Sequence, residues 1–208
     1  MHQPDKEYTR LILVRHGQTR ANKEFLLQGA SDGPLTPQGE AEVEQLGLRM
    51  RGFSIDHVVS SDLSRAYHTA QAIAKYHSLT VDKTPLVREW DCGVWDGRTA
   101  EEFLDMLAST GKPVSAFSPE GGETLEDVRE RALAFLSRVM TQYRGKTVVV
   151  CSHGDFMRML VGCLLDIGID QANLFFFNNG SYSLFEHDGR TWKVIAINRL
   201  PDPEWESF

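Results

Sequence analysis

Two histidines and two arginines stand close to points where short buried strands are expected to end. Arg15 and His16 follow the apolar run Leu11–Val14, and His153 follows the most strand-like run of the chain. Arg65 falls in the first turn of a helix that comes after another short strand. Open parallel sheets bind ligands beyond the carboxyl ends of their strands. If these strands are parallel, we expect the four side chains to meet at one edge of the sheet.

Such a cluster could bind and transfer a phosphoryl group. Two guanidinium groups present fork-shaped donors that match phosphate oxygens. A neutral imidazole nitrogen of His16 could attack phosphorus, and a protonated His153 could stabilise charge in the transition state. Helix N-termini after Ser61 and Gly154 would add backbone donors for an anion. Because fixed positive charge would replace a metal ion, we expect no metal and no cofactor.

The leaving oxygen also needs a proton, and carboxylates follow the third expected strand. Glu89 could protonate the leaving group and then deprotonate an attacking water. Spacing alone does not choose Glu89 over Asp91 or Asp96.

Strand patterns alternate with helix patterns through most of the chain. Strands are expected at 11–14, 55–60, 79–86 and 147–151, with a hairpin of 182–186 and 192–197. A polar loop is expected from Gln18 to about Leu35. Helices are expected after Thr36-Pro37, after Ser60–Asp62, after a capping box at Thr124–Asp127, and over 155–165. This order predicts an α/β sandwich of three layers, with a mainly parallel central sheet and helices on both faces.

The region from about 90 to 122 interrupts that pattern with several glycines and prolines. We interpret it as a small inserted cap, with a short helix over 100–107, in a single domain of residues 1–208. The C-terminal tail from Pro201 is expected to be a surface extension.

Composition limits the partners. The chain has 208 residues and a formal net charge of −7, so nucleic acid and anionic membranes are not expected partners. A small phosphorylated substrate would have to be attracted by local arginines. Three cysteines without metal-ligand spacing indicate a reducing compartment. With a polar N-terminus and no long apolar window, we expect a cytoplasmic protein; the pattern predicts no oligomeric state.

Four motifs resemble those of the histidine phosphatase superfamily, which includes the phosphoglycerate mutases. They are Leu13–Thr19 with Asn22, Ser60–Ala66 with Thr69-Ala70, Arg88-Glu89 with Gly93 and Trp95–Gly97, and Ser152–Gly154. Each motif alone is weak, but their order over residues 13–154 is highly specific.

The resemblance implies a role for each matched residue. It implies that His16 is the nucleophile, that Arg15, Arg65 and His153 form the phosphate pocket, and that Glu89 is the general acid and base. It also implies that Asn22, Gln28, Gly29 and the backbone of Gly154 bind phosphate. The implied fold is the same α/β sandwich.

The cap favours a phosphatase over a mutase. Arg98 and Lys112 are its only basic residues, and Glu89–Gly93 replaces the Glu-Arg-His-Tyr-Gly run of the mutases. The stretch Pro119–Thr124 resembles a loop of broad-specificity and fructose-2,6-bisphosphatase-like phosphatases. We therefore expect a metal-independent phosphomonoesterase that acts on small phosphorylated metabolites through a phosphohistidine on His16. A phosphoglycerate mutase is the nearer alternative, and a regulatory module that only binds phosphorylated ligands is the other.

Simpler interpretations exist for single residues. Arg65 could form a surface ion pair with Asp62, and Glu89 could pair with Arg88. The run Phe175–Phe177 is interpreted as core, and Trp90 and Trp95 as packing within the cap.

Overall fold

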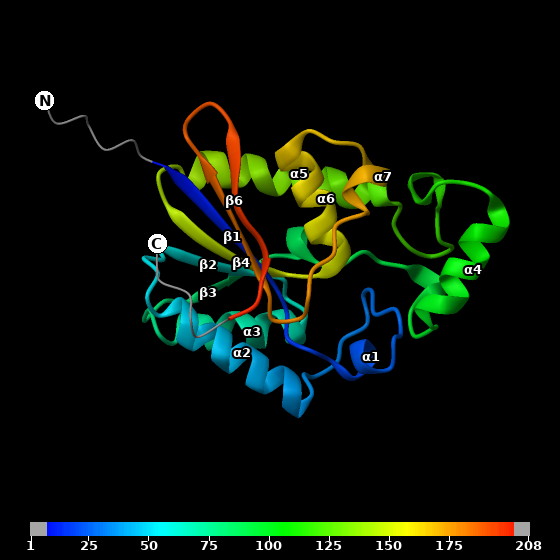
Figure 1. Cartoon of the computed structure of the whole chain (residues 1–208), viewed down its shortest axis with the longest axis horizontal. Coiled ribbons are helices and arrows are strands. Elements are labelled where there is room, and N and C mark those ends of the chain that lie inside the picture. Colours follow the sequence, from blue (N-terminus) through cyan, green and yellow to red (C-terminus); the bar gives the residue numbers. More distant parts are fainter. Residues whose placement is uncertain (1–7, 202–208) are drawn as a thin grey trace, which may run out of the picture.

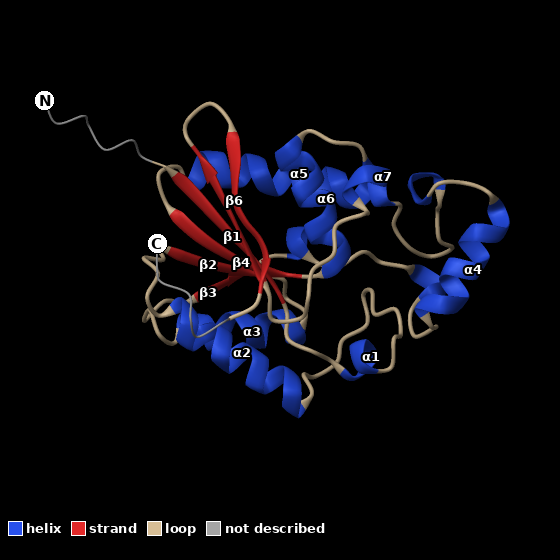
Figure 2. Ribbon diagram, in the orientation of Figure 1, coloured by secondary structure: helices blue, strands red, loops and turns tan. Residues whose placement is uncertain are grey.

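A six-stranded sheet forms the centre of the molecule (Figure 2). The computed structural model describes residues 8–201, so residues 1–7 and the whole tail after Pro201 lie outside the described residues. The strands are β1 (Thr9–Arg15), β2 (His57–Ser60), β3 (Val81–Lys83), β4 (Thr147–Ser152), β5 (Tyr182–His187) and β6 (Trp192–Arg199). Their order across the sheet is β3-β2-β4-β1-β5-β6.

Four neighbouring strands run in the same direction. β1 pairs with β4, β4 with β2, and β2 with β3, all in parallel, while β5 and β6 add an antiparallel hairpin beside β1. The prediction of a mainly parallel sheet with this hairpin is confirmed. The carboxyl ends of β1, β2 and β4 therefore meet at one edge, as the sequence argument requires.

Alternating side chains of the strands divide the core into two halves. Leu11, Leu13 and Val150 pack with α5 (Leu125–Gln142), α6 (Gly154–Leu165) and α7 (Ile169–Ala172). Ile12 and Val14 face the other way, toward α2 (Pro37–Met50) and α3 (Ser64–Ala74), so helices cover both faces (Figure 1). A fully buried aliphatic side chain of this kind contributes about 1.5–3 kcal/mol. The burial of the parallel strands on both faces explains their continuous apolar runs.

Two of the predicted helix starts have the expected caps. The Thr36 side chain accepts a hydrogen bond from the Gly39 N–H, with Pro37 in the first turn. Thr124 and Asp127 form the reciprocal capping box before α5. These caps satisfy N–H groups that the helix itself leaves unpaired.

The expected cap of α3 is wrong. No side chain of Ser60–Asp62 caps this helix; its N-cap is Leu63, which has no capping side chain. Instead Asp32, from the distant loop before α2, accepts hydrogen bonds from the N–H and the hydroxyl of Ser64. A carboxylate at a helix N-terminus is favoured by the helix dipole, and here it comes from another part of the chain.

The third strand is shorter than its prediction. β3 ends at Lys83, and Pro85–Val87 forms a 3-10 turn. The N–H of Leu86 in this turn donates a hydrogen bond to the Thr84 hydroxyl. Pro85 has no N–H for a strand ladder, which explains why the strand stops there. Glu89 consequently follows this turn rather than a strand.

Residues 90–122 contain a 3-10 turn (Gly93–Trp95), α4 (Ala100–Thr110) and a second 3-10 turn (Val114–Ala116). α4 lies beyond the sheet edge, at the far right of Figure 1. The short α1 (Arg20–Lys23) lies below it, nearer to the sheet, in a segment where the sequence predicted only loop. Backbone hydrogen bonds join 25–27 to 97–100. No helix in the described part of the chain is long and apolar enough to cross a membrane.

Candidate active site

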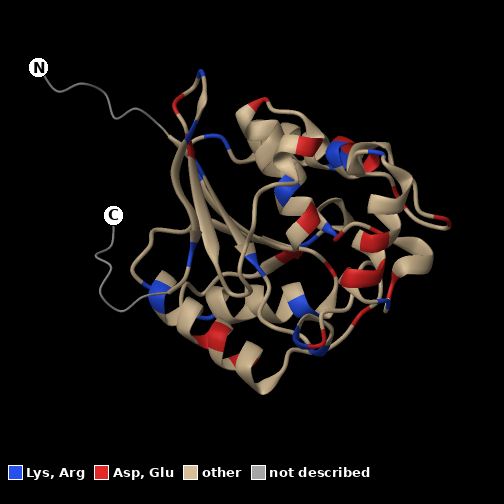
Figure 3. Ribbon diagram, turned by 45° about the vertical axis from the view of Figure 1, so that its right-hand side comes forward, with Lys and Arg blue, Asp and Glu red and all other residues tan. Residues whose placement is uncertain are grey.

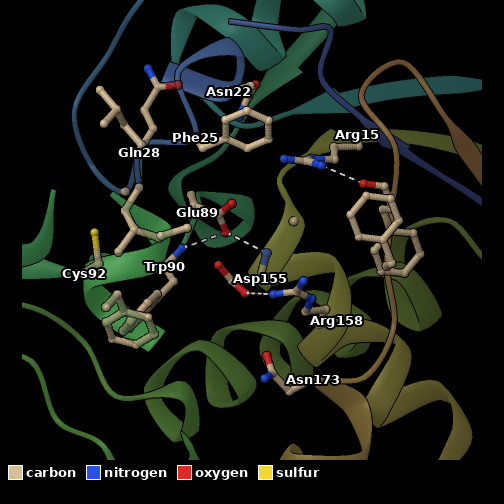
Figure 4. A pocket seen from close by; sticks show the side chains of 18 of the residues that line it. Arg15, Asn22, Phe25, Gln28, Glu89, Trp90, Cys92, Asp155, Arg158 and Asn173 are labelled. Atoms are coloured by element: carbon tan, nitrogen blue, oxygen red, sulfur yellow. Dashed lines mark hydrogen bonds and ion pairs between the residues drawn. The ribbon is translucent and has the colours of Figure 1, made fainter. Parts of the chain in front are cut away.

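A cavity of about 490 Å³ opens beyond the carboxyl ends of β1 and β4 (Figure 4). Seven of the nine predicted site residues line it: Arg15, His16, Asn22, Gln28, Gly29, Glu89 and Gly154. The other two, Arg65 and His153, are completely buried and contact the lining from behind. The structure thus brings all nine into one site.

The hydrogen bond of His16 defines which ring nitrogen is available. Nδ1 of His16 lies 2.8 Å from the carbonyl oxygen of Gly17, which can only accept, so Nδ1 carries the proton. In the neutral ring Nε2 therefore keeps its lone pair. Burial, together with the positive charges of Arg65 and Arg15, holds the pKa of His16 well below its usual value. Both effects favour the neutral form of the buried ring.

The hydrogen bond of His153 to Arg65 favours a neutral ring over the protonated ring that the sequence analysis expected. Nε of Arg65 donates a 3.1 Å hydrogen bond to Nδ1 of His153. Arginine is only a donor, so Nδ1 must be the acceptor and the proton must sit on Nε2. Burial and the nearby Arg65 hold the pKa of His153 well below its usual value. Its role as a donor survives through the Nε2–H group, which is buried and has no partner among the described residues.

The Arg65 guanidinium clamps a loop rather than presenting an open fork. Besides its bond to His153, it donates to the carbonyl oxygens of Ser31, Gln28 and Gly29 at 2.7, 3.2 and 2.8 Å. The surface ion pair of Arg65 with Asp62 is ruled out, because Asp62 pairs with Arg88. Arg65 therefore acts mainly by fixing the loop that carries Gln28 and Gly29 and by orienting His153.

Arg15 retains donor capacity that faces the cavity. Its Nη1 donates to the carbonyl oxygen of Phe177, but its buried Nε has no partner in the described structure. A Cβ placed on Gly154 would lie 3.7 Å from this Nε and 3.8 Å from Oε2 of Glu89. The missing side chain at Gly154 thus leaves open the space between the guanidinium and the carboxyl group.

Glu89 occupies the helix N-terminus that was expected to bind an anion. Its Oε1 accepts hydrogen bonds from the backbone N–H groups of Trp90, Asp155 and Phe156, the last two at the start of α6. Burial and the neighbouring Asp155 carboxylate raise the pKa of Glu89 to about 7. The pairing of Glu89 with Arg88 is excluded, since Arg88 is bound to Asp62. A carboxyl group with this pKa can both give and take a proton near neutral pH.

Asn22 is oriented by hydrogen bonds to its carbonyl group. Oδ1 of Asn22 accepts from the Thr19 N–H and from Nδ2 of Asn179, both near 3 Å. With Oδ1 committed in this way, its amide N–H groups remain available at the cavity wall. The Gln28 side chain instead accepts from the Thr19 hydroxyl, which turns it toward the loop.

The sequence argument missed several lining residues. They are Phe25, Asp155, Arg158, Asn173, Phe176 and Asn179. Asp155 and Arg158 form an ion pair on the first two turns of α6. Their i,i+3 spacing on an expected helix could have predicted this pair from the sequence. Phe176 is exposed at the cavity, so its interpretation as core is wrong, while Phe177 is buried. Trp90 both packs in an aromatic cluster and lines the cavity, whereas Trp95 packs against Phe103 and does not line the cavity.

Arg131 of α5 holds the segment that carries Glu89. Its guanidinium donates to the carbonyl oxygens of Leu86, Arg88 and Glu89 and forms a two-bond ion pair with Glu123. It joins α5 to both ends of the 90–122 region. We expect Arg131→Met to lower the free energy of unfolding by about 2–4 kcal/mol, because three carbonyl groups and a carboxylate lose their donor.

Urea unfolding at pH 7 would measure this change. Arg138→Met is a matched control, since Arg138 lies on the same helix and its guanidinium bonds to the side chains of Gln142 and Tyr143. Equal stability of the two variants would contradict the proposed importance of Arg131.

Comparison with known proteins agrees with this architecture. The sequence matches the model of the histidine phosphatase superfamily (branch 1) over residues 11–200. The chain therefore belongs to the histidine phosphatase superfamily, as its four motifs suggested.

Among individual relatives, "Probable phosphoglycerate mutase GpmB" of Klebsiella pneumoniae (strain 342) is 31% identical over 186 residues, 88% of this chain and 86% of the relative. The structure of Bacillus stearothermophilus YhfR is 27% identical, with a TM-score of 0.84 over 92% of this chain and 98% of its own. A mycobacterial glucosyl-3-phosphoglycerate phosphatase, in complex with VO3, is 25% identical, with a TM-score of 0.81 over 91% and 98% of the two chains. These similarities support a phosphatase or mutase function.

Proposed function

We propose that this protein is a phosphomonoesterase that hydrolyses small phosphorylated metabolites through a phosphohistidine on His16, without a metal ion. One observation carries the proposal. The buried His16 ring holds its proton on Nδ1 against Gly17, so that Nε2 is free, and it lies in the same cavity as a carboxyl group with a pKa of about 7. A nucleophile and a proton donor in one cavity are the two groups that ester cleavage requires.

In the first step, Nε2 of His16 attacks phosphorus and the bond to the ester oxygen breaks. Glu89 in its protonated form gives its proton to the leaving alcohol. Charge on the phosphoryl oxygens is stabilised by Arg15 and by Nε2–H of His153, since Nε of Arg15 and Nε2 of His153 are buried at this site and have no partner within residues 8–201. Arg65 is a positioning residue that keeps Nε2 of His153 protonated through its bond to Nδ1.

In the second step, Glu89 as a carboxylate takes a proton from water. The resulting hydroxide attacks phosphorus, the bond to His16 breaks, and inorganic phosphate leaves. Glu89 is protonated again, and His16 returns to its neutral form with Nδ1 still donating to Gly17.

Hydrolysis is favoured over mutase chemistry by the cavity wall. A phosphoglycerate mutase must hold a carboxylate beside the phosphate of its substrate, and two phosphates in its bisphosphorylated intermediate. The two basic residues of the 90–122 region, Arg98 and Lys112, are exposed and do not line the cavity. Arg98 instead lies over the Trp95 ring.

Mutase activity remains the second candidate function, because a curated relative that covers most of the chain is named as such an enzyme. It would be detected as conversion of 3-phosphoglycerate to 2-phosphoglycerate with a bisphosphoglycerate primer.

The direct test is release of inorganic phosphate from phosphate esters in the presence of EDTA. We expect hydrolysis that EDTA does not reduce. Isomerisation of 3-phosphoglycerate without net phosphate release would establish the mutase instead. Tight binding of phosphate without turnover of any ester would indicate a binding module.

The pH dependence of hydrolysis should have its alkaline limb near neutrality. Only protonated Glu89 can assist the leaving alcohol, so kcat/KM for an alkyl phosphate should fall about tenfold per pH unit above the Glu89 pKa of about 7. On the acidic side, the lowered pKa of His16 should keep the nucleophile neutral below pH 6.5. Initial rates from pH 5 to 9 would test this profile. An alkaline limb that persists unchanged in Glu89→Gln would assign it to another group.

A further inference from the structure

The cavity has a polar floor and an apolar wall. The floor is formed by the groups of the proposed reaction, from β1, α6 and the segment that holds Glu89. The wall is apolar, and its larger side chains are Phe25, Leu26, Leu27, Trp90, Phe103, Leu104, Leu107, Val114 and Phe176. A phosphate on the floor would therefore place the alcohol part of an ester against hydrocarbon.

Three large apolar side chains of this wall are strongly exposed to solvent. Phe25 is 77% exposed, Leu104 60% and Phe176 61%. They come from three separate parts of the chain and meet at one cavity. Exposed apolar groups that gather around a cavity mark a surface to be covered by a ligand.

Phe25 also has an unusual backbone. Its φ angle of 56° lies in the left-handed region, which costs about 1–3 kcal/mol for a residue other than glycine. Figure 4 shows its ring at the cavity, between Asn22 and Arg15. Strain that places an aromatic ring at the mouth of a cavity indicates a role in binding rather than in folding.

The wall is preformed by backbone hydrogen bonds. Leu27 and Arg98 are joined by a bond of 2.8 Å, and Ala100 N–H donates to the Phe25 carbonyl at 2.9 Å. These bonds fix the segment of Phe25 to the start of α4, which carries Leu104. A ligand at this wall therefore meets surfaces that are already in place, which lowers the entropy cost of binding.

The charges around the wall disfavour a second anionic group. Arg15 and Arg158 are the only basic residues among the described residues that line the cavity. Arg15 belongs to the phosphate floor, and Arg158 is bound to Asp155 and to the Phe175 carbonyl. The 90–122 region has six acidic and two basic residues, a net charge of −4 (Figure 3). A carboxylate or second phosphate on the alcohol would meet no free cation there and would be repelled.

We propose that the preferred substrates are monoesters of phosphate with a bulky, uncharged apolar alcohol, aromatic or alicyclic, that packs between Phe25, Leu104 and Phe176. This inference rests on the proposed phosphomonoesterase function and names the substrate class of the same site. In this proposal, the apolar alcohol part of the ester determines which substrates are preferred, and a second phosphate or a carboxylate does not.

Three esters of primary alcohols isolate this effect, because their leaving groups are similar in reactivity: ethyl phosphate, benzyl phosphate and 4-carboxybenzyl phosphate. We expect kcat/KM for benzyl phosphate to exceed that for ethyl phosphate by about 100-fold, from burial of the ring. The added carboxylate should lower kcat/KM by at least about tenfold, because it has no cationic partner.

Variants of the wall provide the second measurement. Phe25→Asn suits the left-handed backbone, and Leu104→Gln suits helix α4. Each should lower kcat/KM for benzyl phosphate about five- to tenfold relative to kcat/KM for ethyl phosphate. Leu133→Gln on α5, equally exposed in character but outside the cavity, should change neither. Leu104→Arg should raise kcat/KM for 4-carboxybenzyl phosphate.

The outcomes separate the two proposals. No phosphate release from any of the three esters would overturn the phosphomonoesterase function. Similar rates for all three, or a preference for the carboxylate ester, would overturn the substrate class while the function stands. An unchanged ratio of benzyl to ethyl phosphate in both wall variants would do the same.

Discussion

Replacement of His16 by alanine is expected to lower turnover of every phosphate ester by about 10⁴-fold or more, the scale typical of removing a covalent nucleophile. Among residues 8–201, no other imidazole is placed to substitute for it. The His153 ring is close, with its centroid 5.1 Å from that of His16, but its Nδ1 accepts from Arg65 and its Nε2 carries the proton. Without a free lone pair, His153 cannot take over the attack.

The measurement has two parts. Turnover is followed by phosphate release, and the phosphoenzyme is trapped from a ³²P-labelled ester as an acid-labile adduct. Wild-type protein should form the adduct and His16→Ala should not. His68→Ala is a suitable control, because His68 is exposed on α3 and does not line the cavity. An adduct of normal yield in His16→Ala would reject His16 as the nucleophile.

Substitution of Glu89 by glutamine is expected to separate the two chemical steps. For an alkyl phosphate, kcat should fall about 10²–10⁴-fold, because the leaving alcohol loses its proton donor. For p-nitrophenyl phosphate, whose leaving group needs no proton, the first step should survive. Water then lacks its base, so the phosphoenzyme should accumulate after a burst of one equivalent of p-nitrophenol. Glu101→Gln, an exposed change on α4, should show neither effect.

The same variant should be more stable than the wild type at alkaline pH. The pKa of Glu89 is about 7 in the folded protein and near 4.5 when unfolded, so the folded state binds the proton more tightly. The stability of the wild type therefore falls as pH rises from about 4.5 to 7, by roughly 3–4 kcal/mol at about 1.4 kcal/mol per unit. Glu89→Gln should remove this loss, raising Tm at pH 8 and leaving it nearly unchanged at pH 5. Lower stability of the variant at pH 8 would contradict the raised pKa.

The sequence was a sufficient guide to the elements whose signals are local. The apolar run at Leu11–Val14 and the strand-like run before His153 became neighbouring parallel strands, so their terminal residues came together. The capping box at Thr124–Asp127 is a four-residue signal, and it marks the start of α5 within one residue. Where the cause lies within a few residues, the pattern determines the structure.

The features that could not be predicted depend on contacts between distant segments. Asp32 caps a helix that begins at Ser64, and Glu89 bonds to the start of α6, 66 and 67 residues later. No local sequence pattern near Ser64 or Phe156 predicts that these carboxylates bind there. They accept hydrogen bonds from N–H groups at these helix ends, which the sequence analysis had expected to face a bound anion.

The loop after α7 shows the same limit. It has no periodic pattern, and its aromatic run was interpreted as core. β5 lies antiparallel beside β1, and Gly180 N–H donates to the Arg15 carbonyl, which brings Phe176 and Asn179 over the cavity. Their location follows from the pairing of strands about 170 residues apart in the chain, so only the fold reveals it.

The separation of floor and wall has an evolutionary consequence. The reacting groups are tied to the sheet edge and to α6, while Phe25, Leu104 and Phe176 make no hydrogen bonds to them through their side chains. Mutations in the wall can therefore accumulate without changing the positions or the hydrogen bonds of His16 and Glu89. Substitutions in α4 and its neighbouring loops can therefore change which alcohol the cavity accepts during evolution. The same residues can be changed in protein engineering to alter substrate selectivity while the reacting groups stay as they are.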